Sequence, residues 1–394
     1  MKSYFSINKE IILPNYEESI VNLPKWILDY FKTGKSKIME GKEKILLLII
    51  DSLGLSLLEE YIKMNKESPL SKLYREGNYI ILQSTFPSTT TTALTSLNTG
   101  LKPLEHAILG YTMFLKEFGA IVNMINFSPA LDNRKETLLD AGLDLNSFLN
   151  SLTFFEKLNQ EGIKGYVITR NFLKNTALSK ILHKGAEILS YVNLSDLFVT
   201  IKNHMKNCKS PSYTFAYWDA LDTLSHIYGP DSEQVFAELD ALSFCLGKIL
   251  NELDKDTLLM ISGDHGSLKA GEIVKYDEQK ELKEKLRLPP AGDSRAFFLF
   301  PKPNKVDDVK NYFDDKLKDK FLCMRIEEAL DLKLFGSGNI HDSFYDRVGE
   351  LLCLAKKNYV FQFRLKRVQE EVTLKGFHGG LSYDEIFLPL IFIR

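Results

Sequence analysis

The chain has 394 residues, of which 44% are hydrophobic, so it can bury a large core, and its length alone would allow two or three domains. Lysine and arginine together number 50 and aspartate and glutamate 52, which leaves a formal net charge of −2. This balance excludes the strongly basic character of a nucleic-acid coat or of a protein that binds an anionic membrane surface.

The N-terminal residues, Met1 to Ser6, lack an apolar segment followed by a small-residue cleavage site. No apolar stretch approaches the roughly 20 residues that cross a bilayer. We therefore expect a cytoplasmic protein without a membrane partner. The 4 cysteines are far apart and form no CxxC pair, which indicates separate thiols instead of a disulfide framework or a structural zinc site.

Three apolar runs are predicted to be buried strands, and each leads into aspartate. They are residues 45–50 before Asp51, 213–218 before Asp219 and Asp222, and 258–262 before Asp264. Continuous apolar runs are typical of strands covered on both faces, as in a parallel sheet. A further strand at 165–169 and a long amphipathic helix between Val235 and Leu253 continue the alternation. The pattern predicts an α/β fold with a mostly parallel central sheet and helices on both faces.

The aspartates that follow these strands are candidate metal ligands. Ligand sites of open α/β sheets lie at the carboxyl ends of the strands, so Asp51, Asp222 and Asp264 are expected to converge. Without a cation, carboxylates packed together would repel one another. His226 follows Asp222 by four residues, on one face of a helix, and His265 is adjacent to Asp264. Mixed nitrogen and oxygen ligands favour zinc, with manganese or iron as alternatives.

A threonine-rich segment, residues 84–97, is the candidate source of a nucleophile. Its proline-containing turn runs into a stretch with helical apolar spacing. A hydroxyl at that junction meets the free N–H groups and the positive end of a helix, which favour an alkoxide or a phosphoryl group. The alternative is an ordinary helix cap.

Six motifs, in this order, resemble the type I phosphodiesterase and nucleotide pyrophosphatase family of the alkaline phosphatase superfamily. They are Ile50 to Gly54, Phe86 to Thr90, Thr99 to His106, Asp222 to Pro230, Asp264 to Gly266, and His378 to Gly380. They span the chain from about residue 44 to the last strand. The resemblance implies an alkaline-phosphatase-like fold and phosphate ester hydrolysis.

The resemblance also implies two divalent metal ions and a threonine nucleophile. One ion would be held by Asp222, His226 and His378. The other would be held by Asp51, Asp264, His265 and Thr90. Counting forward from Phe86 and backward from Gly100 selects Thr90 within the motif, and Thr89 and Thr91 remain alternatives. Attack by Thr90 on phosphorus would form a covalent phosphothreonine that water then hydrolyses.

Two residues are candidate substrate contacts. Tyr111 stands where the family's pyrophosphatases place a phosphate-binding asparagine, and its hydroxyl could donate a similar hydrogen bond. Arg295 could clamp two phosphate oxygens, the alternative being a structural salt bridge.

The chain shows no internal repeat and no low-complexity linker, so we expect residues 1–394 to form a single catalytic domain. Two stretches between the motifs, about 101–160 and 267–376, are expected to wall the site. The second contains a charged run, residues 275–287, predicted as a solvated helix face, and then a turn at 289–295 that leads into a strand at 296–300.

The predicted activity is metal-dependent hydrolysis of small phosphodiesters or nucleotide pyrophosphates. One alternative is a phosphomonoesterase on the same site, although no extra cluster of positive charge accompanies the motifs. The other is an inactive protein that binds nucleotide or metal, although every site residue is present. The sequence does not indicate an oligomeric state.

Overall fold

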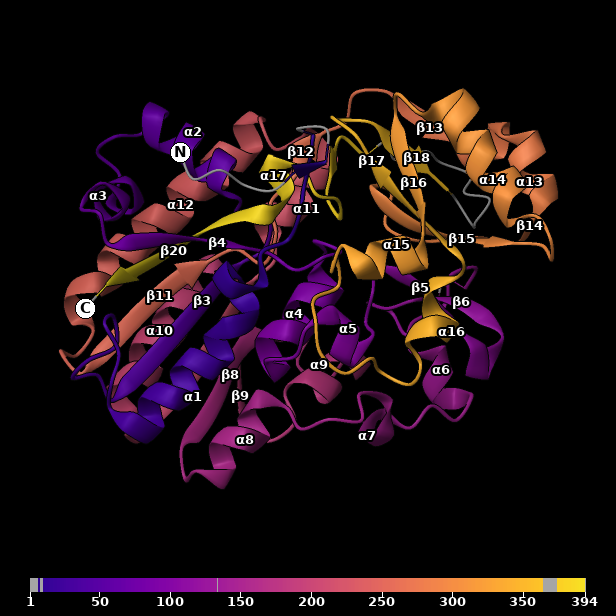
Figure 1. The fold of residues 1–394 in the computed structure, drawn as a ribbon. Coiled ribbons are helices and arrows are strands. Elements are labelled where there is room, and N and C mark those ends of the chain that lie inside the picture. The colour runs from indigo at the N-terminus through magenta and orange to yellow at the C-terminus, as the bar shows by residue number, and fades with distance from the viewer. Residues whose placement is uncertain (1–5, 8–9, 133, 364–373, 394) are drawn as a thin grey trace.

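A seven-stranded, mostly parallel sheet forms the centre of the computed structural model (Figure 1). The structure describes residues 6–7, 10–132, 134–363 and 374–393. In order across the sheet, the strands are β4 (Tyr79–Gln83), β20 (Phe387–Ile393), β11 (Thr257–Ser262), β3 (Lys44–Ile50), β10 (Ser212–Trp218), β8 (Lys164–Arg170) and β9 (Glu187–Tyr191). β20 runs antiparallel to both of its neighbours, and the other pairs are parallel.

The three predicted aspartate-bearing strands are confirmed as β3, β10 and β11, which lie side by side. Every residue of β3 is buried. Ile45, Leu47 and Ile49 pack into one hydrophobic core, whereas the alternate residues pack into a second core behind the sheet. The absence of polar alternation in the sequence is therefore explained by burial of both faces.

Helices cover both faces of this sheet, as predicted. One face packs against α2 (Leu55–Met64), α3 (Pro69–Arg75), α10 (Leu194–Asn207) and α12 (Glu233–Ile249). The other packs against α1 (Leu23–Thr33), α4 (Thr90–Thr99), α8 (Phe154–Gln160) and α9 (Ala177–Leu182). The amphipathic helix predicted before residue 257 is α12.

A second sheet of seven strands is antiparallel throughout and lies beside the first (Figure 1). In order, its strands are β16 (Phe321–Arg325), β17 (Leu351–Ala355), β15 (Ala296–Pro301), β14 (Leu286–Gly292), β5 (Thr112–Leu115), β6 (Ala120–Asn123) and β7 (Ser128–Pro129). The two stretches expected to wall the site therefore both contribute to this sheet. They meet where Gly292 of β14 pairs with Thr112 of β5.

The turn predicted at residues 289–295 is wrong in its bounds. Pro289 and Pro290 lie inside strand β14, and only Asp293 to Arg295 form the connection to β15. The pairing of β14 with β15 shifts register at two places between Leu286 and Ala291. Proline has no N–H group for a strand ladder, so an irregular strand accommodates both prolines. The charged run at 275–287 is α-helical only over α13 (Lys280–Lys285), which follows a 3-10 turn at Tyr276–Glu278.

Shorter elements complete the fold. The helices are α5 (Pro103–His106), α6 (Thr137–Asp140), α7 (Leu145–Phe148), α11 (Ala220–Tyr228), α14 (Val306–Tyr312), α15 (Ile326–Asp331), α16 (Phe344–Val348) and α17 (Tyr383–Ile386). The strands are β1 (Ser6–Ile7), β2 (Ile11–Ile12), β12 (Leu268–Lys269), β13 (Ile273–Lys275), β18 (Val360–Gln362) and β19 (Gly376–Phe377). Within the described ranges, no helix has the length and apolar character needed to span a membrane.

Candidate active site

Asp51 and Asp264 follow the neighbouring parallel strands β3 and β11, which brings their carboxylates to the same edge of the sheet. The N–H of Asp51 donates to the carbonyl of Trp218 at 2.8 Å, and the hydroxyl of Tyr217 donates to Asp51 Oδ2. Asp264 Oδ1 accepts hydrogen bonds from the N–H groups of Ser52 at 3.2 Å and His265 at 3.0 Å. Both carboxylates are thus fixed by backbone or tyrosine donors.

The three predicted histidine ligands are each oriented by a backbone carbonyl. His265 Nδ1 donates to Gly266 at 3.1 Å, and His226 Nδ1 donates to Gly376 at 2.8 Å. His378 Nδ1 donates to Ser88 at 3.1 Å. Because Nδ1 carries the proton in each ring, the Nε2 lone pair is free for a ligand, the usual arrangement behind metal-binding histidines.

The structure gathers these side chains into two adjoining groups. Asp222, His226 and His378 form one group, and Asp51, Asp222 and His265 form the other, with ligand atoms in each lying within 4.8 Å of one another. His226 Nε2 is 3.3 Å from Asp222 Oδ2, as expected for positions four apart on α11. The second group differs from the predicted set, since Asp222 takes part in it.

Asp264, which was predicted for the second group, lies at its edge. Its Oδ2 atom is 3.7 Å from His265 Nε2, whereas Asp51 Oδ1 is 3.2 Å from the same nitrogen. Every predicted aspartate and histidine ligand is therefore at one place in the structure.

Thr90 is the first residue of α4, and its hydroxyl faces this cluster. Its Oγ1 atom is 3.1 Å from His265 Nε2. The neighbouring hydroxyls have other partners: Thr89 Oγ1 donates to Asp293 Oδ1 at 3.0 Å, and Thr91 Oγ1 donates to the carbonyl of Gly110 at 2.9 Å. Of these three threonines, Thr90 alone points its hydroxyl at the cluster.

The two predicted substrate contacts have different surroundings. Tyr111 lies beside the site, where its N–H donates to Asp293 Oδ2 at 3.2 Å, and 46% of its surface is exposed. Arg295 is fully buried, and its Nε and Nη2 donate to the two carboxylate oxygens of Glu385, each at 2.9 Å. Its Nη1 donates to the carbonyl of Tyr359. Arg295 therefore forms the structural salt bridge that the sequence left as the alternative.

Asp293 is a site residue that the sequence reasoning missed. It is buried in the connection between β14 and β15, and it is 204 positions from its partner Thr89. Burial raises the pKa of its carboxyl to about 7, although the Thr89 hydroxyl opposes that shift. No local motif marks it, because its partners belong to the other half of the chain.

The model for the family described as type I phosphodiesterase / nucleotide pyrophosphatase matches residues 45–381. The chain belongs to this family. The resemblance inferred from the motifs is thus confirmed, and the protein is a phosphoric ester hydrolase of the phosphodiesterase and pyrophosphatase type. A comparison with curated proteins found no match.

Several solved structures have the same fold. Murine ectonucleotide pyrophosphatase / phosphodiesterase 5 is 19% identical, with a TM-score of 0.61 and coverage of 88% of each chain. An inactive variant of it in complex with AMP is 18% identical, with a TM-score of 0.62 and coverage of 88% of each chain. Phosphonoacetate hydrolase from Sinorhizobium meliloti 1021, in complex with phosphonoformate, is 16% identical, with a TM-score of 0.66 and coverage of 89% of this chain and 90% of the other. The fold is alkaline-phosphatase-like.

Enzymes of this family are metal-dependent, and the cluster has the features of a cation site. Asp51 Oδ1, Asp222 Oδ1 and Asp264 Oδ2 are buried and make no hydrogen bond within the described part of the chain. The Nε2 atoms of His226 and His378 are 3.2 Å apart, and both are lone-pair nitrogens if their Nδ1 atoms carry the protons. A proton on one of these two nitrogens, or a cation between them, removes the repulsion of the lone pairs.

The pKa shifts of the clustered side chains also indicate a cation site. Burial raises the pKa values of Asp51 and Asp264 well above the ordinary range, and in each the negative charge of a neighbouring aspartate adds to the shift. Burial lowers the pKa of His378, and the nearby His265 lowers it further. Burial opposes the charge of His226, but Asp222 raises its pKa to about 9. Carboxylates and imidazoles crowded in this way fit divalent cations.

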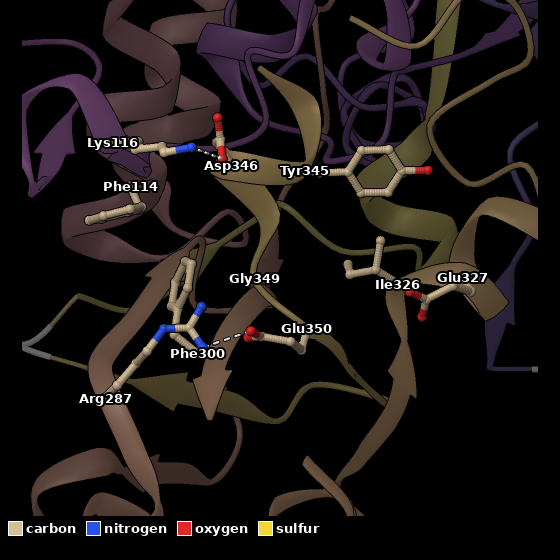
Figure 2. Close-up of a pocket in the computed structure, with 10 residues that line it drawn as sticks. All are labelled: Phe114, Lys116, Arg287, Phe300, Ile326, Glu327, Tyr345, Asp346, Gly349 and Glu350. Atoms are coloured by element: carbon tan, nitrogen blue, oxygen red, sulfur yellow. Dashed lines mark hydrogen bonds and ion pairs between the residues drawn. The ribbon is translucent and has the colours of Figure 1, made fainter. Parts of the chain in front are cut away.

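A separate pocket of about 410 Å³ lies on the second sheet (Figure 2). It includes Lys116 paired with Asp346 at 3.0 Å and Arg287 paired with Glu350 at 2.6 Å. None of its lining residues is a candidate site residue, so this pocket is separate from the candidate active site.

Proposed function

We propose that the protein hydrolyses phosphodiesters or nucleotide pyrophosphates by attack of Thr90 on phosphorus at a two-metal site. The observation that carries this proposal is the position of the Thr90 hydroxyl, 3.1 Å from His265 Nε2 and beside the gathered carboxylates. A nucleophile needs a means of losing its proton and a partner for its negative charge. This location offers both.

The N-terminus of α4 supports the same role. Thr90 begins this helix, and the first N–H groups of a helix have no partner within it. Those N–H groups and the positive end of the helix dipole favour phosphate oxygens. The hydroxyl that attacks and the donors that bind the phosphate therefore belong to one element.

The metal-ligand groups complete the proposal. We expect two divalent ions, zinc by donor type with manganese or iron as alternatives, and they would lower the pKa of the Thr90 hydroxyl and stabilise charge on the phosphate and leaving oxygens. Asp51, Asp264 and His265 would hold one ion together with Thr90. Asp222, His226 and His378 would hold the other, and the bond of His378 to Ser88 links that group to the loop before Thr90.

The proposed substrate class is supported by the binding of AMP to the murine relative. Preference for a diester is supported by the state of Arg295, which is bonded to Glu385 and therefore adds no charge to the site. A phosphomonoester specialist would need extra positive charge against a doubly charged phosphate.

Removal of the Thr90 hydroxyl tests the proposal. We expect Thr90→Ala to lower kcat on bis-p-nitrophenyl phosphate by at least about 1,000-fold, since loss of a nucleophile removes the covalent step. Bound metal, measured by elemental analysis, should remain because the other ligands are intact.

The matched control is Thr92→Val, two positions further along α4. The Thr92 hydroxyl is buried and makes no hydrogen bond to any described residue, and valine has nearly the same shape. This variant should keep kcat within about twofold of the wild-type value, as expected for a residue outside the reacting groups. Near-normal turnover by Thr90→Ala would contradict the nucleophile assignment, and Thr89→Ala and Thr91→Val would then be examined in its place.

A further inference from the structure

Asp293 joins the second sheet to the start of the nucleophile helix. Its Oδ1 accepts a hydrogen bond from the Thr89 hydroxyl at 3.0 Å, and its Oδ2 accepts one from the N–H of Tyr111 at 3.2 Å. Thr89 is the N-cap residue of α4 and is bonded covalently to Thr90. A single carboxylate therefore binds the residue before the proposed nucleophile and the residue before strand β5.

Close backbone packing surrounds this carboxylate. Gly379, next to the ligand His378, has a φ of +109°, and a Cβ atom there would lie 2.6 Å from Asp293 Cβ. Gly110 has a φ of +152°, and a Cβ atom there would lie 3.1 Å from Asp293 Oδ2. Side chains at either place would displace Asp293, so these glycines permit the contact. Three segments of the chain meet at this one side chain.

Ser88, the residue before Thr89, is held by hydrogen bonds that do not involve Asp293. Ser88 donates from its N–H to the carbonyl of Gly379 at 3.3 Å and from its Oγ to that of Gly380 at 2.7 Å. These bonds fasten the loop before α4 to the loop that carries His378. The Thr89 side chain depends on Asp293 alone among the hydrogen bonds of the described residues.

We propose that Asp293 is a positioning residue, which holds Thr89 and Tyr111 so that the Thr90 hydroxyl faces its metal ligands. This inference rests on the proposed function of Thr90. The carboxylate acts through its two acceptor oxygens and not through proton transfer. The second sheet thereby contributes to catalysis at the edge of the central sheet, although none of the predicted metal ligands comes from the second sheet.

The experiment compares Asp293→Ala with Asp293→Asn. Alanine removes both bonds, and we expect kcat on bis-p-nitrophenyl phosphate to fall about 100-fold with KM little changed, since a nucleophile displaced by about 1 Å loses that much rate. Asparagine keeps an oxygen for the Tyr111 N–H, and its amide can donate to the Thr89 hydroxyl. This conservative variant should recover kcat to within about tenfold of the wild type. Metal content should be unchanged in both.

The control is Asp346→Ala, which removes a carboxylate from the exposed ion pair with Lys116 in the separate pocket on the second sheet. It should keep wild-type kcat.

Thr89→Ala and the double variant of Thr89→Ala with Asp293→Ala complete the test. If Asp293 acts through Thr89, the double variant should lose little more activity than Asp293→Ala alone.

Each outcome has a distinct meaning. If Thr90→Ala is inactive but Asp293→Ala keeps wild-type kcat, the positioning role is overturned and the proposed function stands. If Asp293→Asn is as impaired as Asp293→Ala while folded and metal-loaded, proton transfer or charge replaces positioning, and the proposal is overturned. If Asp293→Ala does not fold, the asparagine variant and the Thr89→Ala variant decide by the same criteria. Turnover by Thr90→Ala overturns the proposed function and this inference together.

Discussion

His106 uses both of its ring nitrogens, in contrast to the histidines of the metal-ligand cluster. Its Nδ1 accepts a hydrogen bond from the N–H of Ile108 at 3.0 Å, so its Nε2 carries the proton and donates to Ser96 Oγ at 3.0 Å. The ring is fully buried. Burial lowers its pKa to about 3, with smaller contributions from nearby His341 and Arg347. His106 is therefore neutral in the folded protein.

A neutral buried histidine makes stability depend on pH. Below its ordinary pKa of 6.5 the unfolded chain binds a proton at His106, whereas the folded chain does not bind it until about pH 3. The unfolded state is thus favoured as pH falls, and the stabilising contribution is fully present only above about pH 6.5. Between pH 8 and pH 5, the wild type should lose about 2 kcal/mol of unfolding free energy relative to His106→Asn.

Urea unfolding of both proteins at the two pH values measures this difference. Asparagine is chosen because its Oδ1 can accept the Ile108 N–H bond without titrating. Equal losses in the two proteins would show that His106 does not set this part of the pH dependence.

At the residue scale, the sequence could predict which side chains gather but not how each is held. Asp51, Asp222 and His265 follow apolar strands or helical spacing, and those local patterns place them at one sheet edge. The partner of Arg295 is 90 positions away, and no pattern near either residue links it to Glu385. Asp293 was missed for the same reason.

At the element scale, the connection between β14 and β15 is tied to the short helix α17, which follows β19. Arg295 pairs with Glu385, and both side chains are fully buried. Glu385 also accepts hydrogen bonds from the N–H groups of Gly380 at 2.8 Å and Ser382 at 3.1 Å. Gly380 and Ser382 come shortly after His378, so the ion pair supports the loop that carries this proposed metal ligand.

Breaking the ion pair between Arg295 and Glu385 should destabilise the folded protein. Glu385→Gln leaves the Arg295 guanidinium buried without its counter-charge, and we expect a loss of about 3–5 kcal/mol of unfolding free energy. Zinc binding should weaken as well, because the His378 loop loses its support. Urea unfolding and a zinc titration would measure the two effects.

The control is Glu350→Gln, which breaks the exposed pair with Arg287 at 2.6 Å. Exposed pairs contribute about 1 kcal/mol or less, so this variant should stay close to the wild type. Equal destabilisation by the two substitutions would contradict the supporting role of the buried pair.

The elements that the sequence predicted well are those whose signal is local. The apolar runs of β3, β10 and β11 are covered on both faces, and the stripe of α12 faces one core, so composition and spacing sufficed. Strand β14 was not predicted, because Pro289 and Pro290 are typical of turns and only its irregular pairing with β15 accommodates them. That pairing depends on tertiary context.

At the scale of the whole molecule, the candidate metal ligands follow strands β3 and β11 of the central sheet, lie on α11 or follow β19, and the connection between β14 and β15 of the second sheet supplies Asp293 and Arg295. The sequence predicted inserted stretches beside the site. It did not predict that they share a sheet, because the residues that pair β5 with β14, Thr112 and Gly292, are 180 positions apart. Local periodicity carries no information about such pairing.

The central claim is metal-dependent hydrolysis of a phosphodiester, and one assay tests it directly. Bis-p-nitrophenyl phosphate and p-nitrophenyl phosphate are compared side by side, after chelation and again after zinc or manganese is restored. We expect chelation to abolish turnover, restored metal to return it, and the diester to be the better substrate. Turnover that survives complete removal of metal, or a clear preference for the monoester, would contradict this account.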